Sequence, residues 1–434
     1  MKQGSLLPIV FLLMFLQGIR GQNIFRTVCS GDQVRLDSML TTTSIDTLDR
    51  RGRTLLHWAV ACKQSEVLNN LLDRQKDTEW QARHGGALLE LIVFYDNEPA
   101  IEKLIQAGIN INQKNTRGST ALEIAQRLGK EEIANALLLK GADPGLVRNY
   151  ELKGRYLGQV TPGSTPELFA PNFISTEEQE FGSVFNRAGN EFYFGVDIGS
   201  RNEIRRSKME GNRWSKPEVI VAHEKYGYND PFLSNDEERL YFISNQALDG
   251  AGEPKDIDIW YCERTDEGWS EPINAGSNIN TPEDEYYISF ASAGTMYFSS
   301  NGHPRSDSSD TDSTRTDHDI YYSEFKQGEF QPPVRLPESI NTAAYEADVY
   351  IAPDESYIIF CSTREEGLGG GDLYISFKDA NGTWSEAINM GDDINSDAYE
   401  FCPYVTPDGK FLFYTSNMDI YWVSTTVLEG MRNN

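Results

Sequence analysis

Apolar positions divide the chain into a helical part and a strand-rich part. From about residue 24 to 144 they recur at helical spacing, and rows of them repeat every 33 residues, such as Leu56, Leu89 and Leu122. After a stretch rich in Gly, Pro and Thr, short alternating runs of Tyr, Phe, Ile and Val replace this pattern. Such runs are typical of many short antiparallel strands. We therefore predict a multidomain chain with a helical domain at 22–144, a linker at 145–163 and an all-β domain at 164–428.

Glycine recurs with the same 33-residue period, at Gly52, Gly85 and Gly118, which predicts one turn in each unit. The clearest unit, residues 49–59, reads Asp-Arg-Arg-Gly-Arg-Thr-Leu-Leu-His-Trp-Ala. A unit of this length with a glycine turn and two apolar helical stripes resembles the ankyrin repeat, whose turn is followed by Thr-Pro-Leu-His-x-Ala. The resemblance implies an all-α ankyrin solenoid of stacked helix pairs, because one pair cannot bury its own apolar face.

Five residues of the helical domain carry expectations of their own. His57 occupies the histidine position of the ankyrin signature, which in this family fixes the turn by hydrogen bonding, so we expect a structural role. Gly108 and Gly141 close repeats two and three, where we expect them to cap helices. Cys29 and Cys62 are 33 residues apart, in equivalent positions of neighbouring repeats. Because stacked helices lie about 8–10 Å apart and a disulfide requires Cα atoms within about 7 Å, we predict that these cysteines are not bonded.

The strand-rich part also repeats, in units of about 50–61 residues with four strand-like pieces each. In the last unit, Thr-Pro-Asp-Gly-Lys at 406–410 precedes an apolar strand at 411–416, and Asp-Ile-Tyr follows at 419–421. A Trp-Ser-x-Pro segment, as at 269–272, begins the fourth piece. The pattern resembles the TolB-type, WD40-like β-propeller repeat, and four strands in each unit indicate propeller blades.

Counting strands predicts how the propeller closes. Five copies contain strands one to three, and the last copy has no fourth strand. An additional strand-like segment at 165–171 precedes the first copy. If this segment pairs with the last blade, the ring closes as five four-stranded antiparallel blades without an exposed edge.

An acidic residue recurs where each first strand is expected to begin. Each lies 16 residues after a residue of the preceding segment, which is Ser164, Trp214, Trp269, Phe330 or Trp384. In a propeller these strands line the central channel, so the acids would form a ring at one mouth. One hypothesis is a cation site, or polar contacts to a glycan or a basic peptide. The other is structural, with each carboxylate bonded to the backbone of the adjacent blade, and recurrence in every blade favours it. The candidate residues are Glu180, Asp230, Glu285, Glu346 and Glu400.

Sequence motifs do not indicate catalysis. The chain has no nucleophile elbow, zinc motif or dinucleotide fingerprint, and we assign no catalytic residue, metal ligand or cofactor. An acidic insert at 306–313 begins like a calcium loop but lacks its glycine and closing glutamate, so we expect a solvated loop, with a calcium-stabilised scaffold as the alternative for this segment. The alternative is a glycosidase-like enzyme, because five-bladed propellers host glycosidases with channel-mouth carboxylates. Such an enzyme requires acids in unequal environments, whereas the recurring acids here are equivalent.

The net charge and the N-terminal segment indicate which partners and which location to expect for the protein. The formal net charge of −27 argues against nucleic acids and anionic membrane surfaces as partners, because both would repel the chain. Lys2, an apolar run at 6–16 and small residues at Gly18 and Gly21 predict a cleaved signal peptide at 1–21. The run is too short to span a bilayer. We therefore expect a periplasmic or secreted, non-catalytic scaffold that binds a protein or glycan, without a membrane span after cleavage.

Overall fold

The computed structural model describes residues 24–49, 52–75, 77–115, 117–147, 152–176, 178–199, 201–303 and 317–432. The chain divides into two units, Met1–Tyr150 and Glu151–Asn434. The predicted signal peptide at 1–21 and the acidic insert at 306–313 lie outside the described residues. Within the described ranges, no helix has both the length and the hydrophobicity to cross a membrane.

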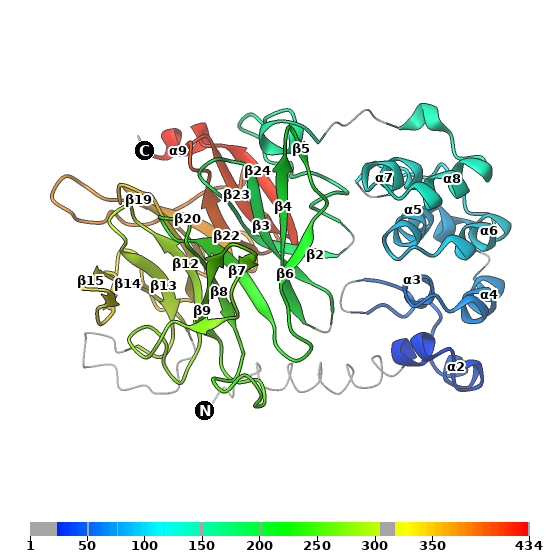
Figure 1. Ribbon diagram of the computed structural model, residues 1–434, viewed down its shortest axis with the longest axis horizontal. Coiled ribbons are helices and arrows are strands. Elements are labelled where there is room, and N and C mark those ends of the chain that lie inside the picture. Colours follow the sequence, from blue (N-terminus) through cyan, green and yellow to red (C-terminus); the bar gives the residue numbers. More distant parts are fainter. Residues whose placement is uncertain are drawn as a thin grey trace. The chain divides into compact units, whose positions relative to one another are not determined.

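The first unit is a stack of helix pairs, as the 33-residue period predicts. Helices α3, α5 and α7 form one layer, and α4, α6 and α8 form a second layer beside it (Figure 1). The repeating leucine rows lie in the core, where Leu56, Leu89 and Leu122 are each at most 1% exposed. A helical segment at 24–30 and the 3-10 helix η1 (Pro144–Leu146) lie at either end. The remaining helices are α2 (Gln33–Leu40), α3 (Leu55–Ala61), α4 (Ser65–Arg74), α5 (Thr78–Phe94), α6 (Glu98–Gln106), α7 (Ala121–Arg127) and α8 (Glu131–Leu139).

Local hydrogen bonds explain where these helices begin and end. The Nδ1 atom of His57 accepts a hydrogen bond from the backbone N–H of Thr54 at 3.0 Å, which caps the start of α3. This confirms the structural role expected for His57, and burial lowers its pKa to about 3, so the ring is neutral. Gly108 and Gly141 have φ of 97° and 96° directly after α6 and α8, as expected of helix caps.

The second glycine of the repeat is not in a turn. Gly85 lies inside α5, which at 17 residues runs through the position where repeats one and three have a turn. A Cβ on its neighbour Gly86 would lie 2.3 Å from the backbone oxygen of Lys114. The expected turn at Gly85 is therefore wrong, because the glycine pair instead lets α5 approach the turn segment of repeat three. The side chain of Asn115 holds this approach with a hydrogen bond to Glu90 at 2.7 Å.

The predicted separation of two cysteines is also wrong. Cys29 and Cys62 form a disulfide, with their Cα atoms 5.2 Å apart. The prediction equated the distance between helix axes with the distance between Cα atoms. Cα atoms on facing sides lie about 2.3 Å from each axis, so they approach well within bonding range. Cys262, Cys361 and Cys402 are free and buried.

Gly86→Ala tests the close approach of α5. We expect it to destabilise the helical unit by about 1–3 kcal/mol, because the methyl group would overlap backbone that has no room to move. Gly430→Ala is the matched control, since α9 (Thr426–Arg432) is also helical and no atom lies within 4 Å of the added Cβ. The control should stabilise its helix by up to about 1 kcal/mol. Hydrogen exchange of peptides covering each site measures both effects, and equal shifts of the same sign would contradict the packing argument.

The second unit is a propeller of five antiparallel blades, which confirms the predicted fold. The first strands of different blades contact one another and therefore surround the channel. They are β2 (Gln179–Phe185), β7 (Tyr228–Leu233), β12 (Glu285–Phe290), β18 (Glu346–Ile351) and β22 (Glu400–Val405). The second strands are β3 (Glu191–Asp197), β8 (Arg239–Ser244), β13 (Met296–Ser300), β19 (Tyr357–Ser362) and β23 (Phe411–Ser416). The third strands are β4 (Asn202–Glu210), β9 (Asp258–Thr265), β14 (Asp319–Ser323), β20 (Asp372–Phe377) and β24 (Asp419–Ser424).

The outer strands are shorter, and in blades one and two they are split in two. These strands are β5 (Arg213–Trp214) with β6 (Glu218–Val221), β10 (Gly268–Trp269) with β11 (Ile273–Asn274), β17 (Val334–Arg335), β21 (Ile388–Asn389) and β1 (Glu167–Leu168). A hairpin of β15 (Phe325–Lys326) and β16 (Glu329–Phe330) extends from blade three. Neighbouring blades pack through apolar side chains, for example Tyr297, Leu336, Val349, Phe360 and Trp384 between blades three and four.

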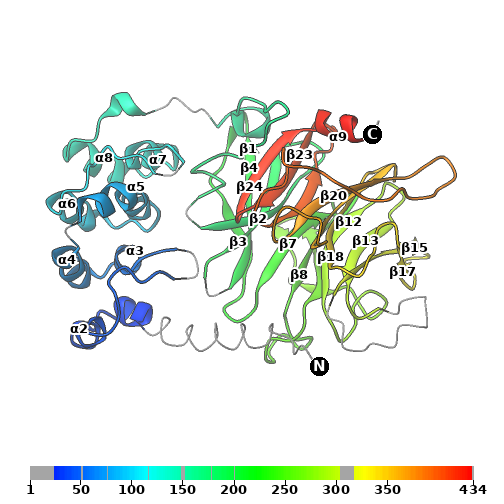
Figure 2. The ribbon, with the colours of Figure 1, turned by 180° about the vertical axis from the view of Figure 1, so that it is seen from behind.

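The ring closes as the strand count predicts. Strand β1 pairs antiparallel with β24, with Glu167 opposite Trp422 and Leu168 opposite Tyr421 (Figure 2). Phe169 follows β1, is fully buried, and its ring lies 5.2 Å from that of Trp422. The 3-10 helix η2 (Arg155–Gly158), from the predicted linker, also packs on this blade, where Tyr156 donates a hydrogen bond to Asp408 at 2.7 Å.

Phe169→Ala tests this closure. We expect a loss of about 3–5 kcal/mol from the free energy of unfolding of the propeller, because a buried aromatic ring is replaced by a cavity. Urea unfolding followed by near-UV circular dichroism measures it. Phe325→Ala, at a ring that is 43% exposed, is the control and should change this free energy by less than about 0.5 kcal/mol. A small effect at position 169 would mean that the ring holds without this strand.

Candidate functional site

Four of the five predicted ring residues lie at one end of the inner strands, where each meets the segment arriving from the previous blade. Each carboxylate accepts two hydrogen bonds from a Ser or Thr four residues earlier, one from its backbone N–H at 2.9–3.0 Å and one from its hydroxyl. All four glutamates are at most 1% exposed. The pairs, called Ser/Thr–Glu pairs below, are Thr176–Glu180, Thr281–Glu285, Thr342–Glu346 and Ser396–Glu400.

In three of these pairs, a second hydroxyl group also donates a hydrogen bond to the glutamate. Ser300, Ser362 and Ser416, each on the second strand of its blade, donate to the carboxylates of Glu285, Glu346 and Glu400 at 2.7, 3.0 and 2.6 Å. Blade one differs, since Val196 lies opposite Glu180. Burial raises the pKa of Glu180 to about 8 and that of Glu285 to about 7. The carboxylates thus tie the connecting segments to the inner strands, and their oxygen atoms are occupied by these contacts.

Blade two departs from the predicted ring. Tyr228 occupies the ring position there, because it pairs with Ser244 as Glu285 pairs with Ser300. The assignment of Asp230 to the ring is therefore wrong, since the link from Trp214 to the inner strand is two residues shorter than in other blades. The Tyr228 hydroxyl donates to Gln246 at 2.7 Å, so blade two has no Ser/Thr–Glu pair.

Asp230 instead lies at a β-bulge of the inner strand, with φ of 53°. Its Oδ1 atom accepts a hydrogen bond from the thiol of Cys402 at 3.3 Å, although these residues belong to blades two and five. Asp348 of blade four lies in the same cluster. Burial raises the pKa of Asp230 to about 6 and raises that of Asp348 well above its usual range. Two poorly hydrated carboxyl groups and a thiol therefore meet inside the channel.

Three asparagine residues also hold the connecting segments in place, and none of them was among the predicted site residues. The side-chain amides of Asn280, Asn341 and Asn395 each bond both the backbone N–H and the C=O of one residue on a third strand. The signal was present in the sequence as Ile-Asn followed by Ser or Thr, directly before three of the Ser/Thr–Glu pairs. Because its side-chain amide has both a donor and an acceptor, asparagine can replace the pair of hydrogen bonds that a neighbouring strand would make with this residue.

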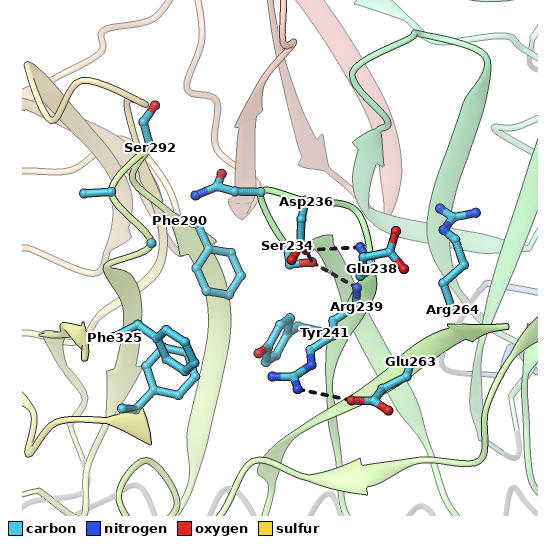
Figure 3. Close-up of a pocket in the computed structure, with 14 residues that line it drawn as sticks. Ser234, Asp236, Glu238, Arg239, Tyr241, Glu263, Arg264, Phe290, Ser292 and Phe325 are labelled. Carbon is cyan, nitrogen blue, oxygen red and sulfur yellow. Dashed lines mark hydrogen bonds and ion pairs between the residues drawn. The ribbon is translucent and has the colours of Figure 1, made fainter. Parts of the chain in front are cut away.

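A cleft of about 550 Å³ lies at the ends of blades two and three. It is formed by the turn joining β7 to β8, the turn joining β12 to β13, and the β15–β16 hairpin. Figure 3 shows the rings of Phe290 and Phe325 on one side and Arg239 with Tyr241 on the other. Phe325 and Phe330 stack edge to face at 5.0 Å, and Phe325 is 43% exposed. The cleft thus combines exposed aromatic surface with charged groups.

Two acids of this cleft, Asp236 and Glu263, are engaged by other residues. Glu263 is paired with Arg239 at 3.1 Å. A hydrogen bond from the Ser234 hydroxyl lowers the pKa of Asp236, which also accepts from the backbone of Glu238 at 3.1 Å. A general acid requires a raised pKa beside a second carboxylate of normal pKa. The lowered pKa of Asp236 is opposite to this requirement, and Glu263 is held in its ion pair.

Fold and site together define a protein with a stack of ankyrin-type helix pairs and a five-bladed propeller whose channel-mouth glutamates tie the connecting segments to the inner strands. The family model "Ankyrin repeat" matches residues 51–81, which confirms that resemblance. The nuclear factor NF-kappa-B p105 subunit of Gallus gallus is 30% identical over 102 residues, 23% of this chain, and the match spans only 10% of that relative.

Among solved structures, TolB from Acinetobacter baumannii is 13% identical with a TM-score of 0.37, covering 58% of this chain and 55% of that one. A putative TolB from Agrobacterium tumefaciens is 15% identical with a TM-score of 0.36, covering 56% and 71%. The number of blades follows from the strand pairing of this chain itself.

Glu180→Gln tests the protonation of the Ser/Thr–Glu pair in blade one. The pKa of Glu180 is about 8 in the folded state, against 4.5 ordinarily, so the folded state binds the proton more tightly. Its contribution to stability is therefore present at low pH and lost as pH rises toward 8. Between pH 5 and pH 7 the wild type should lose about 2–3 kcal/mol relative to the neutral glutamine variant. Urea unfolding of both proteins at the two pH values measures the difference, and parallel pH profiles would show that Glu180 is ionised in the folded state.

Proposed function

We propose that this chain is an exported, non-catalytic scaffold that binds partner proteins through its ankyrin unit and its propeller. The observation that carries the proposal is that the channel-mouth glutamates have a structural role within the fold. Four of them are buried and hydrogen-bonded to the segments that join the blades. Carboxylates held in this way fix the connecting segments and are not free to contact a substrate. These glutamates therefore provide no acid pair for the glycosidase alternative.

The cleft supports binding of a protein segment. Aromatic rings and arginine are enriched where proteins bind one another, and the cleft presents Phe325, Phe330 and Arg239 together. Arg239 is held in place by Glu263 and by the ring of Tyr261, 4.6 Å away. A pre-positioned side chain loses little conformational entropy when a partner binds. The cleft suits an extended peptide that inserts an apolar side chain against the phenylalanines.

The ankyrin unit supplies a second surface. Ankyrin stacks commonly bind proteins through their turns, and Leu48 beside the turn of repeat one is 55% exposed. An exposed leucine at this position is an apolar contact for a partner. The net charge of −27 favours neutral or cationic partners at long range and opposes nucleic acids.

Export to the periplasm or the extracellular space is supported by two observations. The sequence of residues 1–21 has the pattern of a cleaved signal peptide. The Cys29–Cys62 disulfide is of the kind that persists in oxidising compartments and is rare in the cytosol.

Site-specific photo-crosslinking in cells of the source organism tests the scaffold. A benzophenone amino acid replaces Phe325 in the cleft, Leu48 in the ankyrin unit, or Leu248 in the loop between β8 and β9. Leu248 is 69% exposed and serves as the control for chance encounters. We expect defined protein adducts from positions 325 and 48 but not from 248. Phe325→Ala should then weaken binding of the purified cleft partner at least about tenfold, in line with an interface hot spot.

Equal labelling at all three positions would contradict specific binding at either surface. Adducts with glycans alone would replace the protein partner with a carbohydrate. An adduct at only one position would restrict the scaffold to that unit.

A further inference from the structure

The five inner strands share one irregularity that sequence spacing does not reveal. Each has a bulge residue with positive φ two positions after the ring residue, between 46° and 53° in all five blades. The strand register breaks at the same place in each blade. The backbone is therefore equivalent in every blade, whereas the side chains differ. The five residues, called the bulge residues below, are Gly182, Asp230, Tyr287, Asp348 and Cys402.

Two contacts show that the bulge residues meet across the channel. The thiol of Cys402 in blade five lies 3.3 Å from Asp230 of blade two, which is not its neighbour in the ring. The hydroxyl of Tyr287 in blade three donates to the backbone oxygen of Pro403 in blade five at 2.9 Å. Gly182 of blade one makes room for this approach, because a Cβ there would lie 2.7 Å from Oδ1 of Asp230.

Asp230, Asp348 and Cys402 have the spacing of a metal site. One carboxylate oxygen of each aspartate and the sulfur of Cys402 all lie within 4.8 Å of one another. In a tetrahedral zinc site, with Zn–S of about 2.3 Å and Zn–O of about 2.0–2.2 Å, neighbouring ligand atoms lie about 3.3–3.7 Å apart. The distance between Cys402 and Asp230 already falls in that range, and small rotations of Asp348 would complete the set.

Asp348 gives an independent indication of a ligand. Its side chain is only 8% exposed and points into the cluster. Within the described part of the chain, its carboxylate accepts no hydrogen bond and forms no ion pair, and the charged group acting on it is Asp230. A buried carboxylate without a partner is unfavourable. A divalent cation between the two aspartates would satisfy both.

We propose that Asp230, Asp348 and Cys402 bind Zn²⁺ on the channel axis, with water as the fourth ligand. Cysteine sulfur favours zinc over calcium, which takes six to eight oxygen ligands. On binding, the Cys402 thiol loses its proton to solvent and the sulfur becomes a thiolate ligand. The ion would join blades two, four and five, in addition to the hydrogen bonds of the Ser/Thr–Glu pairs. The site is independent of the scaffold function, since none of its residues lines the cleft.

Metal titration of the full chain tests the site. The protein is stripped with EDTA and titrated with Zn²⁺ in competition with a chromophoric chelator, and separately with Co²⁺. We expect one equivalent of Zn²⁺, and with Co²⁺ a thiolate-to-cobalt charge-transfer band. Cys402→Ser should remove the band and weaken Zn²⁺ binding at least about tenfold. Cys262→Ser is the matched control, since Cys262 is also free and buried but lies on β9, outside the cluster.

Thermal unfolding separates loss of the site from loss of the fold. Without metal, Asp348→Asn should unfold at a temperature equal to or above that of the wild type, because it removes a buried ionisable group that lies beside Asp230. With Zn²⁺ in excess, the wild type and Cys262→Ser should gain Tm, whereas Asp348→Asn should not. No stoichiometric binding, a band that persists in Cys402→Ser, or the same Zn²⁺-dependent gain in Asp348→Asn would overturn the proposal. In those cases the cluster is a pair of carboxyl groups sharing protons.

Discussion

Pairing of β1 with β24 is the contact on which the propeller depends. It joins residues 167–168 to residues 421–422 and supplies the only strand that the last blade lacks. Without it, the outer edge of β24 would be unpaired, and unpaired edges favour association with other chains. A closed ring also holds the inner strands at fixed positions around the channel. Both the Ser/Thr–Glu pairs and the bulge residues take their geometry from that constraint.

Two positions recur on every inner strand of the propeller, the ring position and the bulge position, and their side chains follow different rules. At the ring position four blades have glutamate, and its contacts repeat from blade to blade because each connecting segment needs the same hydrogen bonds. At the bulge position the backbone repeats but the side chains do not, with Gly182, Asp230, Tyr287, Asp348 and Cys402 in the five blades. A role repeated in every blade indicates architecture. A position that is constant in backbone and variable in side chain is where a repeat fold can carry specific chemistry.

The two units of the chain present surfaces of different kinds. Ankyrin repeats stack rigid helix pairs and expose the turns between them. The propeller holds a cleft between the ends of two blades, with aromatic rings on one side and arginine on the other. In both units the polar residues that belong to sequence motifs, His57 and the ring glutamates, are bonded within the fold. Side chains suited to partners lie elsewhere, as Phe325 and Leu48 do.

The sequence alone determined the features that depend on local pattern and on counting. The 33-residue rows predicted the helix pairs, the four-strand units predicted the blades, and the unpaired segment at 165–171 predicted the closure. His57 and the capping glycines were also predictable, because their hydrogen bonds are made within a few residues.

Tertiary structure decided what depends on distances between segments far apart in the chain. Spacing placed Gly85 in a turn, but it lies inside the longer helix α5, where its neighbour Gly86 packs against the backbone of Lys114. Cys29 and Cys62 bond because facing Cα atoms lie closer than helix axes do. Asp230 has a constant spacing from Trp214 but sits two residues beyond the ring position, and its neighbours come from blades four and five. Periodicity gives the order of residues along each blade, whereas only the closed ring determines which side chains meet on its axis.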